Sequence, residues 1–276
     1  MRTSPIAVPS QHSARQPHLR WYIALAAVML LTATAAYGGE IVTLNPQAAR
    51  LNGAPITADT VNFADYDQIV QAADGASFTE NGYLPIRGFS LAGASVAASG
   101  LDNTSGAGWG AYMHITGGGT PVLTSFGTPG AVYTQLNYQI VGFNGLATYG
   151  FAPDGSVVVG GTINGPVTLA SGSLLSGNVA FVPASPVGLT IEGTVSTTLD
   201  QAAPGFFAGS LPGAIDLTIL HPPGDYTATS PTTTQVAAES GTNGTFVAAV
   251  PEPGSVFLLA AGLLGVGNVR RRGLRR

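Results

Sequence analysis

Side chains that could take part in catalysis are few and far apart in this sequence. Cysteine is absent, which excludes disulfides, thiolate metal sites and cysteine nucleophiles. His12 and His18 lie near the amino terminus, and His114 and His221 are distant from each other without the spacing of a zinc site. No G-x-S-x-G elbow occurs. We therefore expect no catalytic residues and no cofactor, with His114 solvated or hydrogen-bonded between strands.

Carboxylates are the next candidates for chemistry. Asp65 and Asp67 are two residues apart, so they would share one face of a strand, and glycoside hydrolysis uses carboxylate pairs. Alternation also brings such neighbours together by chance. Asp59 and Asp74 could join them around Ca²⁺, but the spacing matches neither an EF-hand loop nor a calcium-binding repeat. We expect no metal site.

Aromatic residues in the middle of the chain offer a different chemistry, because sugar rings stack on Tyr and Trp faces. The candidates are Trp109, Tyr112, Tyr133 and Tyr138. Alternation directs Trp109 inward and Tyr112 outward. Tyr112 is therefore the candidate sugar contact, and we expect the others to pack in the core.

The elements that carry these residues have the pattern of strands. Residues 189–200, 109–116, 135–140 and 215–219 alternate between apolar and polar side chains, as strands with one buried face do. Pro153-Asp154-Gly155-Ser156 separates two such runs and predicts a hairpin. The pattern predicts an all-β fold, an antiparallel β-sandwich over residues 36–221, with a parallel β-helix as the alternative. Residues 222–250, rich in Thr, Ser, Gly and Pro, are interpreted as a spacer.

The amino-terminal end has the order of a secretory signal. Arginines precede the apolar run 21–33, and small residues follow it. We expect a signal helix within residues 1–35 that directs the chain to the Sec export machinery, with cleavage after Ala35 and with Ala33 and Ala35 as the small pair. An uncleaved signal anchor is the alternative.

The carboxyl-terminal end combines three signals in order. Pro251, Glu252 and Pro253 favour an extended shape that suits a processing enzyme's cleft. A hydrophobic helix is expected over residues 255–269. At a rise of about 1.5 Å per residue, this helix would be shorter than a hydrocarbon core of about 30 Å. The arginines that follow favour retention on the cytoplasmic side: Arg270, Arg271, Arg272, Arg275 and Arg276. An ordinary membrane helix is the alternative.

Charge sets limits on partners. The chain contains no lysine, and residues 36–250 hold thirteen acidic residues against two arginines, a net charge of about −11. Such a surface repels phosphates, so nucleic acid is not an expected partner.

Residues 251–276 closely resemble the PEP-CTERM sorting signal of Gram-negative bacteria that produce exopolysaccharide. The resemblance implies recognition by an exosortase near Pro251, Glu252 and Pro253, transient anchoring in the inner membrane, and then release or transfer to the surface.

The body resembles, in short patches, the flocculation-associated PEP-CTERM proteins. These patches are residues 56–59, 63–66, 78–83, 108–112 and 115–117. The resemblance implies a secreted or cell-surface matrix protein, structural rather than enzymatic, that supports aggregation or biofilm together with exopolysaccharide. A lectin-like carbohydrate-binding module is the alternative, followed by a polysaccharide-degrading enzyme.

Overall fold

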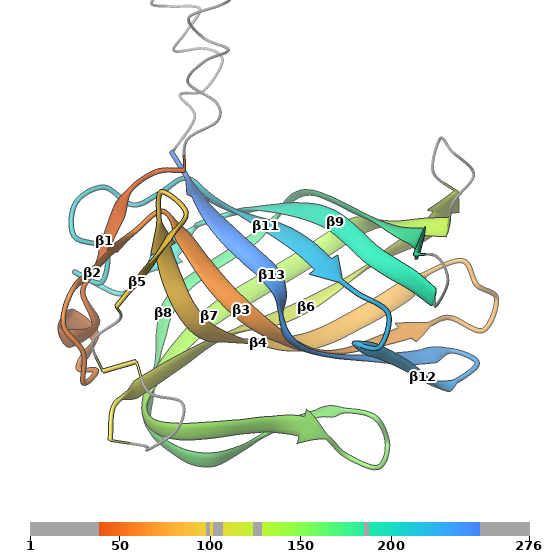
Figure 1. Ribbon diagram of the computed structural model, residues 1–276, viewed down its shortest axis with the longest axis horizontal. Helices are drawn as coiled ribbons and strands as arrows, with labels where there is room; N and C mark the ends of the chain where they lie inside the picture. The colour runs from red at the N-terminus through yellow and green to blue at the C-terminus, as the bar shows by residue number, and fades with distance from the viewer. Residues whose placement is uncertain (1–38, 98–99, 102–106, 124–128, 185–187, 249–276) are drawn as a thin grey trace, which may run out of the picture. The chain divides into compact units, whose positions relative to one another are not determined.

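The computed structural model consists almost entirely of β-strands (Figure 1). It describes residues 39–97, 100–101, 107–123, 129–184 and 188–248. The strands are β1 (Val42–Leu44), β2 (Ile56–Ala58), β3 (Thr60–Gln71), β4 (Phe78–Leu91), β5 (Ala94–Val96), β6 (Trp109–Leu123), β7 (Pro129–Phe151), β8 (Val157–Ala184), β9 (Gly188–Thr198), β10 (Gln201–Ala202), β11 (Ala214–His221), β12 (Tyr226–Ser230) and β13 (Thr233–Val247). A short 3-10 helix, η2 (Pro46–Ala49), lies between β1 and β2.

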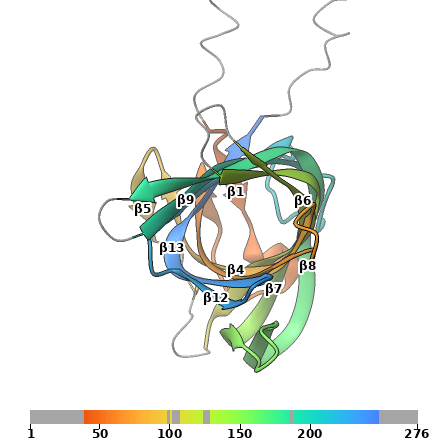
Figure 2. The ribbon, with the colours of Figure 1, turned by 90° about the vertical axis from the view of Figure 1, so that its right-hand side faces the viewer.

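The long strands form one sheet that closes on itself. Their order is β8-β7-β6-β4-β3-β13-β11-β9, and β9 pairs with β8 as well as with β11. Figure 2 shows these strands as a ring. Every pairing between the named strands is antiparallel. The prediction of an all-β antiparallel fold is therefore confirmed, and the alternative of a parallel β-helix is not confirmed. The two layers expected of a β-sandwich are here parts of one continuous sheet.

Period-two alternation decides which side chains face the interior. On β6, Trp109 and Met113 are completely buried, and on β7 Tyr138 is buried between the exposed Asn137 and Gln139. Burying one face of each strand removes apolar area from water at about 25 cal/mol per Å² and stabilises the closed sheet. The inward direction of Trp109 is confirmed.

Residues 222–250 correct one prediction from the sequence. The expected spacer contains β12 and β13, and β13 lies within the sheet between β3 and β11. Asn243 is exposed, while Val236, Ala238, Thr242 and Phe246 are buried. A strand with one solvated face needs only every second side chain to be apolar, and threonine is well suited to strands. The low apolar content was therefore compatible with a strand.

Part of the β7–β8 hairpin extends beyond the ring as an arm, residues 145–163. Here β7 pairs only with β8, because its pairing with β6 ends at Asn144. Gly145, with φ of 119°, begins the arm in a backbone conformation that favours glycine. The expected Pro153–Ser156 hairpin turn closes it, with the Ala152 amide donating to Ser156 O at 2.9 Å. The arm folds back on the outer face of the sheet, where Tyr149 stacks on Tyr66 at 5.6 Å between ring centroids.

One end of the ring is covered by the first elements of the described chain. β1 pairs with β2, and η2 follows β1 (Figure 1). The Asn45 amide donates to Phe206 O at 2.6 Å, and Phe207 packs edge-on against Phe246 of β13. The core therefore continues from the ring into this end.

Across the residues that the structure covers, no helix combines the length and the apolar character that a membrane span requires.

Candidate functional site

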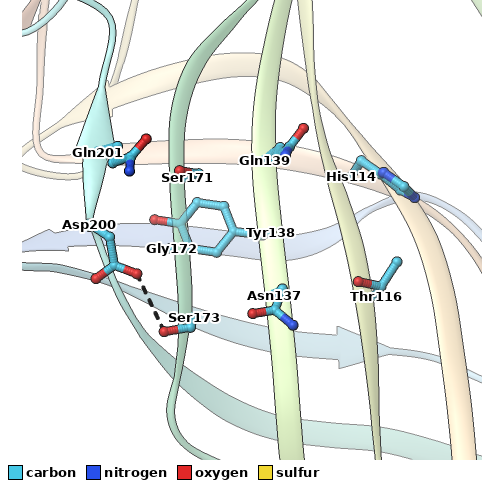
Figure 3. A pocket seen from close by; sticks show the side chains of 10 residues that line it. All are labelled: His114, Thr116, Asn137, Tyr138, Gln139, Ser171, Gly172, Ser173, Asp200 and Gln201. Atoms are coloured by element: carbon cyan, nitrogen blue, oxygen red, sulfur yellow. Dashed lines mark hydrogen bonds between the residues drawn. The ribbon is translucent and has the colours of Figure 1, made fainter.

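A polar groove of about 600 Å³ runs across the outer face of β6, β7, β8 and β10 (Figure 3). Two rows of side chains line it, because antiparallel register places partners on neighbouring strands side by side. In the first row His114 of β6 is opposite Gln139 of β7, Gln139 is opposite Ser171 of β8, and Ser171 is opposite Gln201 of β10.

The second row lies two residues away on the same face. Thr116 is opposite Asn137, and Asn137 is opposite Ser173. Ser173 Oγ donates to Asp200 Oδ2 at 3.4 Å, which places a carboxylate at the β10 end of the row. Figure 3 shows Asn137 and Gln139 projecting between the side chains of β6 and β8. The two rows together present hydroxyl and amide groups, each of which can both donate and accept hydrogen bonds.

His114 is held firmly at the β6 side of the groove. Its Nε2 lies 2.9 Å from Asn81 Oδ1 of β4, and its ring stacks on Tyr83 at 4.4 Å between centroids. The predicted interstrand hydrogen bond is therefore confirmed. Partial burial lowers the pKa of His114, so its ring is neutral at pH 7.

Tyr112, the candidate sugar contact, is partly exposed but lies outside the groove. Its ring packs against Tyr83, Phe143 and Tyr149 with centroids 5.4, 6.0 and 6.2 Å away. The arm thus covers part of the Tyr112 ring. Tyr133 and Tyr138 are buried, as the core-packing expectation required.

A second polar cluster lies in the interior of the ring. Asp65 of β3, 2% exposed, places Oδ2 3.0 Å from His221 Nε2, and Thr242 Oγ1 donates to the same oxygen at 3.2 Å. Burial acts to raise the pKa of Asp65, but hydrogen bonds from His221 and Asp67 and the charge of His221 hold it below its ordinary value. The cluster joins β3, β11 and β13.

Two more carboxylates extend this interior cluster toward β4. Burial, together with the charges of Asp65 and Glu80, raises the pKa of Asp67 well above its ordinary value. Burial also raises the pKa of Glu80, to about 7, although the Tyr133 hydroxyl donates a hydrogen bond to Glu80 Oε2 and opposes the shift. A protonated Asp67 can donate to its neighbours, which is how three carboxyl groups are accommodated out of water.

The acidic residues considered for calcium are separated by the fold. Asp59 Oδ2 accepts from the Ala92 amide at 2.7 Å, and Asp74 Oδ1 accepts from the Ala76 amide at 3.0 Å in a turn. Asp65 and Asp67 face the interior. Within the described ranges, no three acidic or histidine side chains are arranged to hold a metal ion.

Sequence reasoning missed the interior contacts of His221, Thr242 and Glu80. The signal for His221 was present: alternation from Ile215 through Leu217 continues to His221, which places it inward. Thr242 fell in the segment interpreted as a spacer. The expected sorting and signal residues lie outside the described residues: Ala33, Ala35, Pro251, Glu252, Pro253, Arg270, Arg271, Arg272, Arg275 and Arg276.

Comparison with known protein families gives a match at the carboxyl end. A family model described as the PEP-CTERM protein-sorting motif matches residues 249–272. Searches of curated proteins and of solved structures found no match. A sorting motif of this kind implies export and a cell-surface or extracellular location in bacteria, with an exosortase as the processing enzyme. At its carboxyl end, as its sequence predicts, this chain carries a PEP-CTERM protein-sorting motif.

Proposed function

We propose that this chain is a structural protein of the extracellular matrix or cell surface of a Gram-negative bacterium, where it supports exopolysaccharide-associated aggregation. The sorting motif at residues 249–272 carries the proposal, because a protein addressed to the cell exterior acts there. The Sec machinery exports the chain, the apolar run 255–269 holds it briefly in the inner membrane, and an exosortase processes it near Pro251, Glu252 and Pro253.

The composition of the body supports a role outside the cell. The strands of one closed sheet satisfy one another's backbone groups, so the ring leaves few free edges for uncontrolled strand pairing. Cysteine is absent, and the core alone stabilises a body of this size. The acidic balance of residues 36–250 keeps such a protein soluble among other chains.

A non-catalytic role is part of the proposal. Among the described residues, Asp65, Asp67 and Glu80 are carboxylates with shifted pKa values, and they are between 2% and 7% exposed inside the ring. A polymer substrate cannot reach side chains in that position. Their hydrogen bonds to one another, to His221 and to Tyr133 give them a structural role instead.

Gene deletion in the native host tests this function. We expect the deletion strain to make normal amounts of extracellular polysaccharide but to form smaller aggregates, with restoration on re-expression of the full chain. Aggregate size by light scattering and total carbohydrate in the extracellular fraction are the two measurements. Unchanged aggregates in a strain without a compensating homologue would overturn the proposed function.

A further inference from the structure

We propose that the groove across β6, β7 and β8 binds an internal segment of a neutral polysaccharide; this inference rests on the proposed function and names its ligand. The groove lies on the outer wall, so a polymer can reach it without entering the ring (Figure 3). Its volume of about 600 Å³ is within the range of about 300–1,000 Å³ typical of ligand sites.

The chemistry of the two rows matches that of sugar hydroxyl groups. Asn137 and Gln139 are exposed amides in the centre of the groove, and Ser171 and Ser173 present hydroxyls beside them. Each of these groups donates and accepts, as a sugar hydroxyl does, so paired hydrogen bonds can form in either direction. Adjacent strands are about 4.8 Å apart, close to the length of one pyranose unit along an extended glycan.

Charge in the groove argues for a neutral ligand. Asp200 contributes a carboxylate, His114 is neutral at pH 7, and the lining residues that the structure describes include no arginine. A uronate-rich or phosphorylated polymer would bring negative charge against Asp200 without a cation to compensate it. A neutral chain meets no such penalty.

The groove is also preorganised, which lowers the entropic cost of binding. Asn137 and Gln139 project from β7, which has a paired strand on each side. His114 is fixed by Asn81 and stacks on Tyr83, so the β6 margin offers a ring surface against which the apolar face of a sugar can pack. Ser173 is oriented by Asp200 and by Thr198 Oγ1 at 3.2 Å.

Affinity electrophoresis of the full chain in mild detergent tests the proposal. The probes are four neutral polymers, dextran, galactomannan, xyloglucan and a β-1,3-glucan, with alginate as the acidic comparison. We expect retardation by at least one neutral polymer and none by alginate. No retardation by any neutral polymer, or stronger retardation by alginate, would overturn the inference.

Variants locate the binding. The Asn137→Ala/Gln139→Ala double variant removes two hydrogen-bonding amides, so its dissociation constant for the retarding polymer should rise about tenfold or more. Asn243→Ala, an exposed asparagine of β13 on another part of the wall, is the matched control and should bind normally. Asn137→Asp, nearly identical in shape, is a second variant whose folding is preserved and whose binding should also weaken. Binding by both groove variants at the level of the parent chain would contradict the assignment.

Failure of the groove and failure of the proposed function give different results. If the deletion strain aggregates normally but the purified chain binds a neutral polymer through Asn137 and Gln139, the matrix role fails and the groove assignment holds. If the double variant fully restores aggregation in the deletion strain and binds the neutral polymer no less tightly than the parent chain does, the groove assignment fails and the matrix role holds.

Discussion

The carboxylate of Asp67 occupies the space beside the backbone of Gly82 where a side chain would begin. The two residues are partners across β3 and β4, and Asp67 Oδ1 lies where the Cβ atom of any larger residue 82 would stand. Ile115 Cγ1 of β6 is 3.0 Å from the same position, so a side chain at residue 82 would also crowd the neighbouring strand on the other side. The interior cluster therefore depends on a glycine in the neighbouring strand.

Replacement of this glycine should destabilise the protein strongly. In Gly82→Ala the new methyl group displaces the Asp67 carboxylate from its hydrogen bonds, and we expect a loss of about 2–4 kcal/mol in the free energy of unfolding. Gly88→Ala on the same strand is the matched control, because the nearest atom to its added Cβ is Asn62 Nδ2 at 3.9 Å. Urea unfolding measures both, and equal losses in the two variants would contradict the close-approach argument.

Stability should fall as pH rises from 5 to 8. Glu80 has a pKa of about 7 in the folded chain and an ordinary value of 4.5, so the folded state keeps a proton that the unfolded state has released. The raised pKa of Asp67 acts in the same direction. Asp65, whose pKa is lowered, contributes only in stronger acid, because its stabilisation is lost as pH falls through that lowered value.

A charge-free variant separates this effect from general pH sensitivity. Glu80→Gln removes the titrating group and still accepts from Tyr133, so the fall between pH 5 and 8 should shrink by about 1–3 kcal/mol. The exposed Glu192→Gln on β9 is the control and should keep the full dependence. Thermal unfolding across this pH range provides the comparison; identical pH profiles for Glu80→Gln and the parent chain would show that Glu80 does not titrate there.

Loss of His221 should cost far more than loss of His114. His221→Ala leaves the buried Asp65 carboxylate without its nearest partner, and breaking such a buried pair costs about 3–5 kcal/mol. His114→Ala removes one partly exposed hydrogen bond and a ring contact, worth about 1–2 kcal/mol. Denaturant unfolding ranks the two variants, and the reverse order would mean that the interior pair contributes little.

The strands were predictable because their pattern is local. Trp109, Met113 and Tyr138 are buried where alternation places them, and the Pro153–Ser156 turn is determined by its own residues. Closure of the sheet was not predictable, since strands of an open and of a closed sheet have the same alternation. The pairing of β8 with β9 that completes the ring emerges only from the three-dimensional arrangement.

The candidate site was predictable only in part for a related reason. The outward direction of Tyr112 follows from one strand, but the groove combines residues from β6, β7, β8 and β10 whose register no single segment contains. The inward position of Thr242 could not be predicted for two reasons. The composition around it is rich in threonine, and the register shift between Ala238 and Thr242 interrupts simple alternation.

Processing at the carboxyl end should depend on the three residues at the start of the sorting signal. Replacement of Pro251, Glu252 and Pro253 by alanine removes the conformational restriction that suits an enzyme cleft, so the unprocessed chain should remain with the membrane. Ser255→Ala, just beyond the three residues, is the control and should be processed normally. Intact mass spectrometry of the extracellular and membrane fractions distinguishes the forms: the parent chain should lack its carboxyl-terminal tail outside the cell, whereas normal release of the triple variant would show that processing does not use these residues.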